Sequence, residues 1–189
     1  MPTSPALPVI LLLSGSLRAG SVNEAVLRTA ESVAAEGAAA VAAVRYEGLA
    51  DLPHFNPDDD ADPLPAPVAA LREAIAGAAA LLVCAPEYAG TLPGSFKNLL
   101  DWTVGGTEIS DKPVAWVNAA APGRGGGAEA TLRTVLGYTG AAVVDAACVR
   151  IPVDRGTVGA DGAVTDPAVR ERLAEVLALL AGAAEEGEV

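Results

Sequence analysis

Five short apolar runs alternate with helical segments along this chain, and this alternation sets the strongest limit on its fold. The predicted strands are Val9–Leu13, Ala40–Tyr46, Ala79–Ala85, Lys112–Ala121 and Ala141–Val149. The predicted helices run from Ser21 to about Gly37, over Pro67–Ala78, at the end of Pro86–Trp102, over Ala128–Tyr138, and from Ala168 to about Ala184. Such a repeat favours an α/β fold, with a doubly wound parallel sheet, helices on both faces and right-handed crossovers.

Three loops rich in Gly, Ser and Pro follow the first, third and fourth predicted strands. They begin at Ser14, Pro86 and Pro122. Because the carboxyl ends of parallel strands lie at one edge of a sheet, we expect these loops to converge. In the strand order 2-1-3-4-5, strands one and three flank the switch point where a ligand binds. The sequence therefore predicts a binding crevice between the loops.

The first of these loops has the composition of a phosphate-binding site. The segment Ser14–Ser21 contains glycines, serines and Arg18, and Ser21 or Asn23 can cap the following helix. Backbone N–H groups at a helix N-terminus, with an arginine beside them, favour an anion. Neither Gly-Lys-Ser/Thr nor G-x-G-x-x-G is present, which excludes the Walker and dinucleotide motifs. An ordinary strand-to-helix turn with solvated serines is the alternative interpretation.

Charge and composition limit the function further. The net charge of −12 argues against nucleic acid and anionic membranes as partners. With 51% hydrophobic and 19% charged residues, the chain can form one domain over 1–189, with its core at about 7–184. No apolar run reaches the roughly 20 residues that span a bilayer. The apolar start, Leu7–Leu13, is too short for a secretory signal, so we expect a cytoplasmic protein.

The titratable side chains give little sign of metal or thiol chemistry. Cys84 and Cys148 lie in apolar runs, where inert core thiols are usual. His54 is the only histidine and lies in a loop rich in Pro and Asp, so we expect no metal site. That loop, 47–67, is either functional or a solvated acidic connector.

Three segments resemble the NADPH-dependent FMN reductase family, which includes chromate, quinone and azo-dye reductases. Gly15–Asn23 resembles its phosphate loop, Pro86–Trp102 its flavin-ring loop and following helix, and Leu52–Asp58 the segment after strand two. The resemblance extends from about Leu7 to Val149. It implies a flavodoxin-like sheet of order 2-1-3-4-5, FMN as cofactor, and NADPH or NADH as electron donor.

The resemblance also implies which residues bind the cofactor and the substrate. The expected cofactor-binding residues are Ser16, Arg18, Ser21, Val22, Asn23, Pro86, Glu87, Tyr88, Ala89, Gly90, Pro122 and Gly123. The expected substrate-binding residues are Tyr88 and Arg124. The family often has Asn where this chain has Ala89, so a side-chain amide contact to the ring is lost. It often has Ser or Thr where this chain has Ala121, and both differences are expected to alter hydrogen bonding to the ring and the flavin potential. Alternatively, Glu87 and Arg124 are solvated and Tyr88 packs on the helix below.

The function implied by the resemblance is ping-pong hydride transfer from NAD(P)H to flavin, quinone or a similar small acceptor. Since a flavin carries the chemistry, no catalytic side chain is expected. The resemblance further implies a homodimer or a dimer of dimers, for which Phe55 or Leu92 could supply apolar interface surface. A flavodoxin-type electron carrier is one alternative, and a nucleotide-monophosphate domain without flavin is another.

Overall fold

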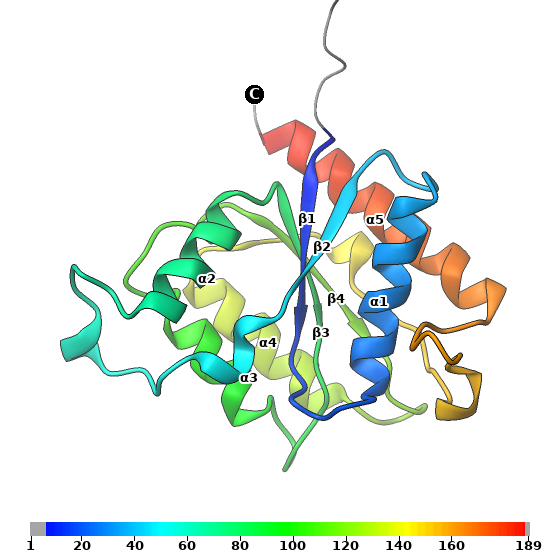
Figure 1. Ribbon diagram of the computed structural model, residues 1–189, viewed down its shortest axis with the longest axis horizontal. Coiled ribbons are helices and arrows are strands. Elements are labelled where there is room, and N and C mark those ends of the chain that lie inside the picture. The colour runs from blue at the N-terminus through cyan, green and yellow to red at the C-terminus, as the bar shows by residue number, and fades with distance from the viewer. Residues whose placement is uncertain (1–6, 188–189) are drawn as a thin grey trace, which may run out of the picture.

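The computed structural model describes residues 7–187 and shows a parallel sheet between two layers of helices (Figure 1). The sheet has the strand order β2-β1-β3-β4-β5, and β6 also pairs with β4. Its strands are β1 (Val9–Ser14), β2 (Ala42–Tyr46), β3 (Ala80–Cys84), β4 (Pro113–Asn118), β5 (Ala142–Val143) and β6 (Val149–Arg150). All pairs are parallel, which confirms the predicted fold class and strand order.

The predicted fifth strand, Ala141–Val149, is wrong as a single element. Val143 pairs with Val114 near the start of β4, and Val149 pairs with Val117 near its end. The chain therefore uses more residues than β4 does over this distance, and the surplus forms a 3-10 turn at Asp145–Ala147. Asp and Ala are poor strand formers, which explains where the break falls. The predicted fourth strand is also too long, since β4 ends at Asn118.

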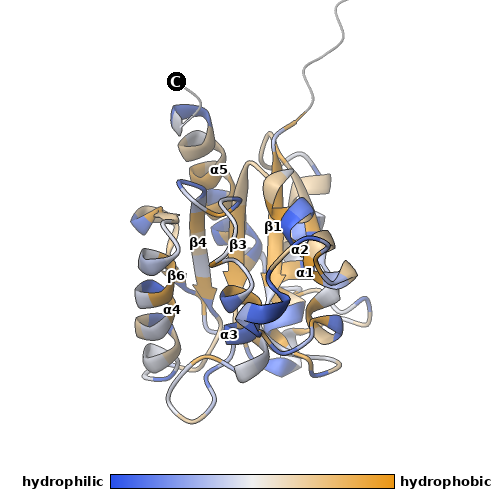
Figure 2. Cartoon of the chain, turned by 90° about the vertical axis from the view of Figure 1, so that its left-hand side faces the viewer, coloured by the Kyte–Doolittle hydropathy of each residue, from blue (hydrophilic) through white to orange (hydrophobic). Residues whose placement is uncertain are grey.

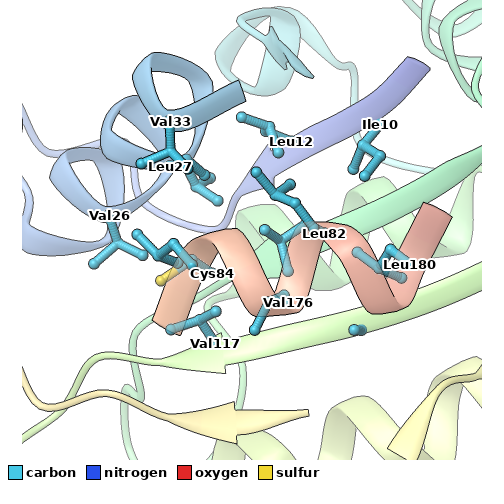
Figure 3. Close-up of a cluster of buried hydrophobic side chains, with 14 of the residues drawn as sticks. Ile10, Leu12, Val26, Leu27, Val33, Leu82, Cys84, Val117, Val176 and Leu180 are labelled. Atoms are coloured by element: carbon cyan, nitrogen blue, oxygen red, sulfur yellow. The ribbon is translucent and has the colours of Figure 1, made fainter. Parts of the chain in front are cut away.

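Alternate residues of the central strands face opposite layers of helices. Ile10 and Leu12 pack under α1 (Val22–Ala35) and α5 (Pro167–Gly187), as Figure 3 shows. Leu11 and Leu13 face α2 (Ala66–Ala76), α3 (Gly94–Asp101) and α4 (Gly126–Tyr138). Figure 2 shows the apolar strands enclosed between the helices. Burial on both faces explains why these strands read as continuous apolar runs.

The long segment after β2 is packed against α3. The indole Nε1 of Trp102 donates to the carbonyl oxygen of Pro53 at 2.8 Å. The Phe55 ring meets Trp102 edge-on at 5.0 Å between centroids. Leu92, the other candidate for an interface, is a buried core residue. These contacts anchor the segment at Pro53 and Phe55, while most residues of 47–67 are exposed.

The structure also bears on the expectations for the cysteines, the last helix and membrane-spanning segments. Cys84 is fully buried, whereas Cys148 is half-buried at the end of the 3-10 turn. Helix α5 continues to Gly187, three residues beyond the predicted end. Within residues 7–187, no helix is both long and apolar enough to cross a membrane.

Candidate functional site

The loops after β1, β3 and β4 converge on a cleft of about 350 Å³ at the carboxyl edge of the sheet. It is lined by Val22, Asn23, Ala85, Pro86, Glu87, Ala119, Ala120, Ala121, Arg124, Gly125 and Val153. Five of the predicted site residues therefore line it, namely Val22, Asn23, Pro86, Glu87 and Arg124. The others, Ser16, Arg18, Ser21, Tyr88, Ala89, Gly90, Pro122 and Gly123, lie in the same loops outside this lining. Sequence reasoning missed Val153, although it follows a strand that ends at the same edge.

The loop after β1 is folded by its own serines. The Oγ of Ser16 accepts the backbone N–H of Arg18 at 3.3 Å. The Oγ of Ser21 accepts the N–H of Asn23 at 3.2 Å, which makes Ser21 the N-cap of α1. At Gly15 an added Cβ would lie 2.5 Å from the Cβ of Ala85, so only glycine lets this loop approach β3.

This loop offers groups that can bind a phosphate. The N-terminus of α1 supplies backbone N–H groups and the positive end of the helix dipole. The guanidinium of Arg18 is exposed and makes no ion pair with any residue in 7–187. In a chain with a net charge of −12, a cation without a carboxylate partner is available to an external anion.

The side chain of Asn23, which lines the cleft, forms a hydrogen bond with a buried cysteine of the core. Its Oδ1 accepts a hydrogen bond from the Cys84 Sγ at 3.4 Å, and its Nδ2 lies 3.4 Å from the Oγ of Ser21. Burial raises the pKa of the Cys84 thiol, so the sulfur keeps its proton and acts as donor. The thiol is therefore inert as a nucleophile, and its contact fixes the orientation of the Asn23 amide.

The loop after β3 is a tight hairpin turn. Tyr88 and Thr91 exchange backbone hydrogen bonds of 3.0 and 3.1 Å. The two residues between them, Ala89 and Gly90, have φ angles of 51° and 79°. Positive φ at both central positions is the requirement of a type I′ turn. The turn carries Tyr88 outward with 53% of its surface exposed, which contradicts packing of Tyr88 on the helix below.

Glu87 joins this turn to the beginning of α4. Its Oε2 accepts the backbone N–H groups of Gly127 at 2.7 Å and Ala128 at 3.2 Å. These are orphan donors of the first turn of the helix, so the carboxylate acts as a cap from a distant part of the chain. At Gly127 an added Cβ would lie 2.0 Å from the carbonyl oxygen of Gly90. Glu87 is thus not a solvated carboxylate, and the second and third loops form one rigid wall.

A buried amide, which sequence reasoning did not single out, fixes the loop after β4. The Oδ1 of Asn118 accepts the N–H of Ala120 at 3.0 Å, and its Nδ2 donates to the carbonyl of Arg124 at 3.2 Å. The same Nδ2 donates to Glu129, whose pKa is lowered by its hydrogen bond with the Arg150 guanidinium. The only signal in the sequence is an amide at the end of an apolar strand. This network sets the outer wall of the cleft, and Arg124 projects there as an exposed side chain.

The fold and the cleft together define a class of protein. A parallel sheet of order 2-1-3-4-5, with a crevice beside the first βα turn, is the flavodoxin-like arrangement for binding a mononucleotide. The family model for NADPH-dependent FMN reductase matches residues 8–155, so the chain belongs to that family. This confirms the resemblance and, with it, the predictions of FMN as cofactor and of an NAD(P)H-dependent oxidoreductase.

Individual relatives agree with this assignment. An NAD(P)H-dependent FMN reductase of Pseudomonas aeruginosa is 33% identical over 90% of this chain and 92% of its own length. A quinone reductase of Escherichia coli is 36% identical over 59% of this chain and 56% of its own length. Among solved structures, the flavoenzyme NAD(P)H:(acceptor) oxidoreductase FerB of Paracoccus denitrificans superimposes with a TM-score of 0.79 at 29% identity, over 95% of this chain and 98% of that one.

Proposed function

We propose that the protein uses FMN to oxidise NADPH or NADH and to reduce small acceptors, with quinones as the best class. The observation that carries this proposal is the cleft itself. One wall has a capped helix N-terminus, and the preceding loop carries Arg18, which forms no ion pair within residues 7–187. The other wall has the glycine-rich loop and the Glu87-anchored turn. A relative named as a quinone reductase supports this choice of acceptor.

Each wall of the cleft has its own part in the proposed function. Ser16, Arg18, Ser21, Val22 and Asn23 hold the FMN phosphate through hydroxyl, guanidinium, amide and backbone N–H groups. Backbone groups of Pro86, Glu87, Tyr88, Ala89 and Gly90 line one side of the ring, and Pro122 and Gly123 close the other. When bound, FMN supplies the hydride chemistry, while the protein contributes binding, orientation and electrostatics.

Acceptor choice is broad in this proposal, because few polar side chains converge in the cleft. Tyr88, exposed at the rim, offers a flat apolar surface to an aromatic acceptor. A pocket of backbone and small side chains enforces little discrimination. Quinones are therefore expected to turn over fastest, with azo compounds and metal oxyanions slower, as competition assays at fixed NADPH would measure.

An absorption spectrum of the purified protein, followed by NADPH oxidation, tests the proposed function. A flavin spectrum together with NADPH-dependent quinone reduction is expected. A flavin spectrum without direct NADPH oxidation would instead favour a flavodoxin-type carrier. A protein that stays colourless after reconstitution with FMN would favour a domain for another mononucleotide.

Arg18→Ala is the sharpest test of the phosphate site. Because Arg18 has no carboxylate partner in the described part of the chain, its loss should weaken FMN binding by about 1.5–3 kcal/mol, as for a hydrogen bond to a charged group. Binding of riboflavin, which lacks the phosphate, should not change. Arg172→Ala, which removes an exposed arginine of α5 paired with Glu175, is the control. Equal FMN affinity of the wild type and Arg18→Ala in a fluorescence titration would contradict the assignment.

The proposal also covers the oligomeric state and the cellular location of the protein. The protein acts as a homodimer or a dimer of dimers in the cytoplasm, with Leu52–Asp58 and α3 close to the flavin of a partner. Leu92 is buried and supplies no interface surface, whereas Phe55 is only half-buried beside Trp102 and remains a candidate for the interface. Light scattering at micromolar concentration should give at least twice the monomer mass, and a fully active monomer would contradict this part.

A further inference from the structure

Most of the cations of this chain form ion pairs within the protein. Of its twelve lysines and arginines, eight form ion pairs with carboxylates, and Lys112 donates to the carbonyl of Ala78 at 2.6 Å. Three arginines are without a carboxylate partner among residues 7–187, namely Arg18, Arg124 and Arg155. All three are exposed. On an acidic protein, exposed arginines without carboxylate partners are the side chains available to bind an external anion.

These three arginines lie at the same edge of the sheet. Arg18 follows β1 and Arg124 follows β4, while Arg155 begins a 3-10 turn, η4 (Arg155–Thr157), in the segment after β6. Because β6 runs parallel to β4, its following segment leaves at the carboxyl edge. The N–H of Val153 donates to the carbonyl of Ala119 at 3.2 Å, and both residues line the cleft. Arg155 thus lies two residues beyond the outer wall.

Three carboxylates in these loops and in α4 have hydrogen-bond or ion-pair partners of their own. Glu87 caps α4, Glu129 pairs with Arg150, and the Oδ1 of Asp154 accepts the N–H of Gly156 at 2.7 Å. Among residues 7–187, neither Arg124 nor Arg155 forms an ion pair with any of these carboxylates. One FMN phosphate already has Arg18, hydroxyl groups and the N-terminus of α1. Two further guanidinium groups exceed the needs of that phosphate and indicate a second, larger anion.

We propose that Arg124 and Arg155 form a second anion subsite, which binds the phosphates of the nicotinamide nucleotide and selects NADPH over NADH. This inference rests on the proposed function. Arg124 lines the cleft and meets the diphosphate, since the nicotinamide must reach the flavin inside it. Arg155 lies further out and meets the 2′-phosphate, which is the group that distinguishes NADPH from NADH. A guanidinium matches a phosphate with two parallel hydrogen bonds, which makes arginine well suited to this task.

The test compares Arg155→Ala, Arg155→Lys and the control Arg172→Ala in the FMN-loaded protein. The assays use one quinone at a saturating concentration. Arg155→Ala should lower kcat/KM for NADPH about tenfold, because KM for NADPH rises, whereas kcat/KM for NADH should change less than about twofold. Arg155→Lys, which keeps the charge, should recover most of this loss. Calorimetric titration with 2′,5′-ADP and with ADP gives a readout independent of turnover. Only the affinity for 2′,5′-ADP should fall in Arg155→Ala, again about tenfold.

Several outcomes would overturn the inference. An equal loss for NADPH and NADH would show that Arg155 does not read the 2′-phosphate. No loss for either nucleotide, or the same loss in Arg172→Ala, would remove it from nucleotide binding. A weaker affinity for FMN with unchanged nucleotide preference would place it in the flavin phosphate site. A wild-type protein that binds FMN but oxidises neither nucleotide would contradict the proposed function itself. This result differs from the outcomes above, which concern only the role of Arg155.

Discussion

Ala89 adopts a backbone conformation that its side chain disfavours. Its φ of 51° lies in the left-handed region, where a residue with a Cβ other than Asn or Asp is uncommon. A type I′ turn prefers Asn-Gly or Gly-Gly at its two centres, and here Ala89 precedes Gly90. The family's frequent Asn at this position is therefore a turn-forming residue as well as a candidate contact for the flavin ring.

Ala89→Gly should make the protein more stable. Glycine removes the left-handed strain, and we expect a gain of about 0.5–1 kcal/mol in the free energy of unfolding, reduced by the extra entropy of the unfolded chain. Urea unfolding of the FMN-free protein would measure it. The matched control is Gly90→Ala, which places a Cβ at φ 79° and should destabilise by a similar amount. A lower unfolding midpoint for Ala89→Gly would contradict this account of the turn.

Local structural roles in the candidate site were predictable where neighbouring residues in the sequence carry the signal. Ser21 and Asn23 stand beside a glycine loop at a helix start, and the structure makes Ser21 the cap. The partners of Glu87, by contrast, are N–H groups 40 and 41 residues away, and nothing local indicates them. Asn118 was missed for the same reason, because its role depends on Arg124 and Glu129.

Among secondary-structure elements, those with a strong local pattern were predicted best. The core strands β1 and β3 match their predicted ranges within one residue at each end, since both are continuous apolar runs. The fifth strand was predicted as one element because its apolar composition is nearly uniform. Its break is set by pairing with two separate parts of β4, which a single sequence does not reveal.

Thr29 is the side chain that ties the segment before α5 to α1. Its Oγ1 donates to the carbonyl of Ala25 and accepts the N–H of Val164, both at 2.7 Å, in a fully buried position. Thr29→Val keeps the shape but leaves the Val164 N–H without a partner, which should cost about 1–3 kcal/mol. Thr29→Ser keeps the hydroxyl and is the control. Thermal unfolding measures the stability of both variants. Equal midpoints for the wild type and Thr29→Val would show that this hydrogen bond does not stabilise the protein.

At the scale of the whole molecule, a buried ion pair links the long segment after β2 to the layer formed by helices α2 and α3. The Arg72 guanidinium lies 2.7 Å from the Oδ1 of Asp60, and it donates to the carbonyl of Trp102 at 2.8 and 3.0 Å. Both side chains of the ion pair are about nine-tenths buried. The sequence predicted this segment only as functional or solvated, because its anchors lie at distant positions in α2 and at the end of α3.

A double-mutant cycle on this pair tests whether it holds the fold. Arg72→Met leaves the Asp60 carboxylate buried and unpaired and strips the Trp102 carbonyl of its donors, so we expect a loss of about 3–5 kcal/mol. Asp60→Asn keeps a hydrogen-bond acceptor and should cost less. The double variant Arg72→Met/Asp60→Asn should be more stable than the sum of the single losses predicts, because it contains no unpaired buried charge. Strict additivity in urea unfolding would mean that solvent reaches both groups and that the segment is held by Trp102 and Phe55 alone.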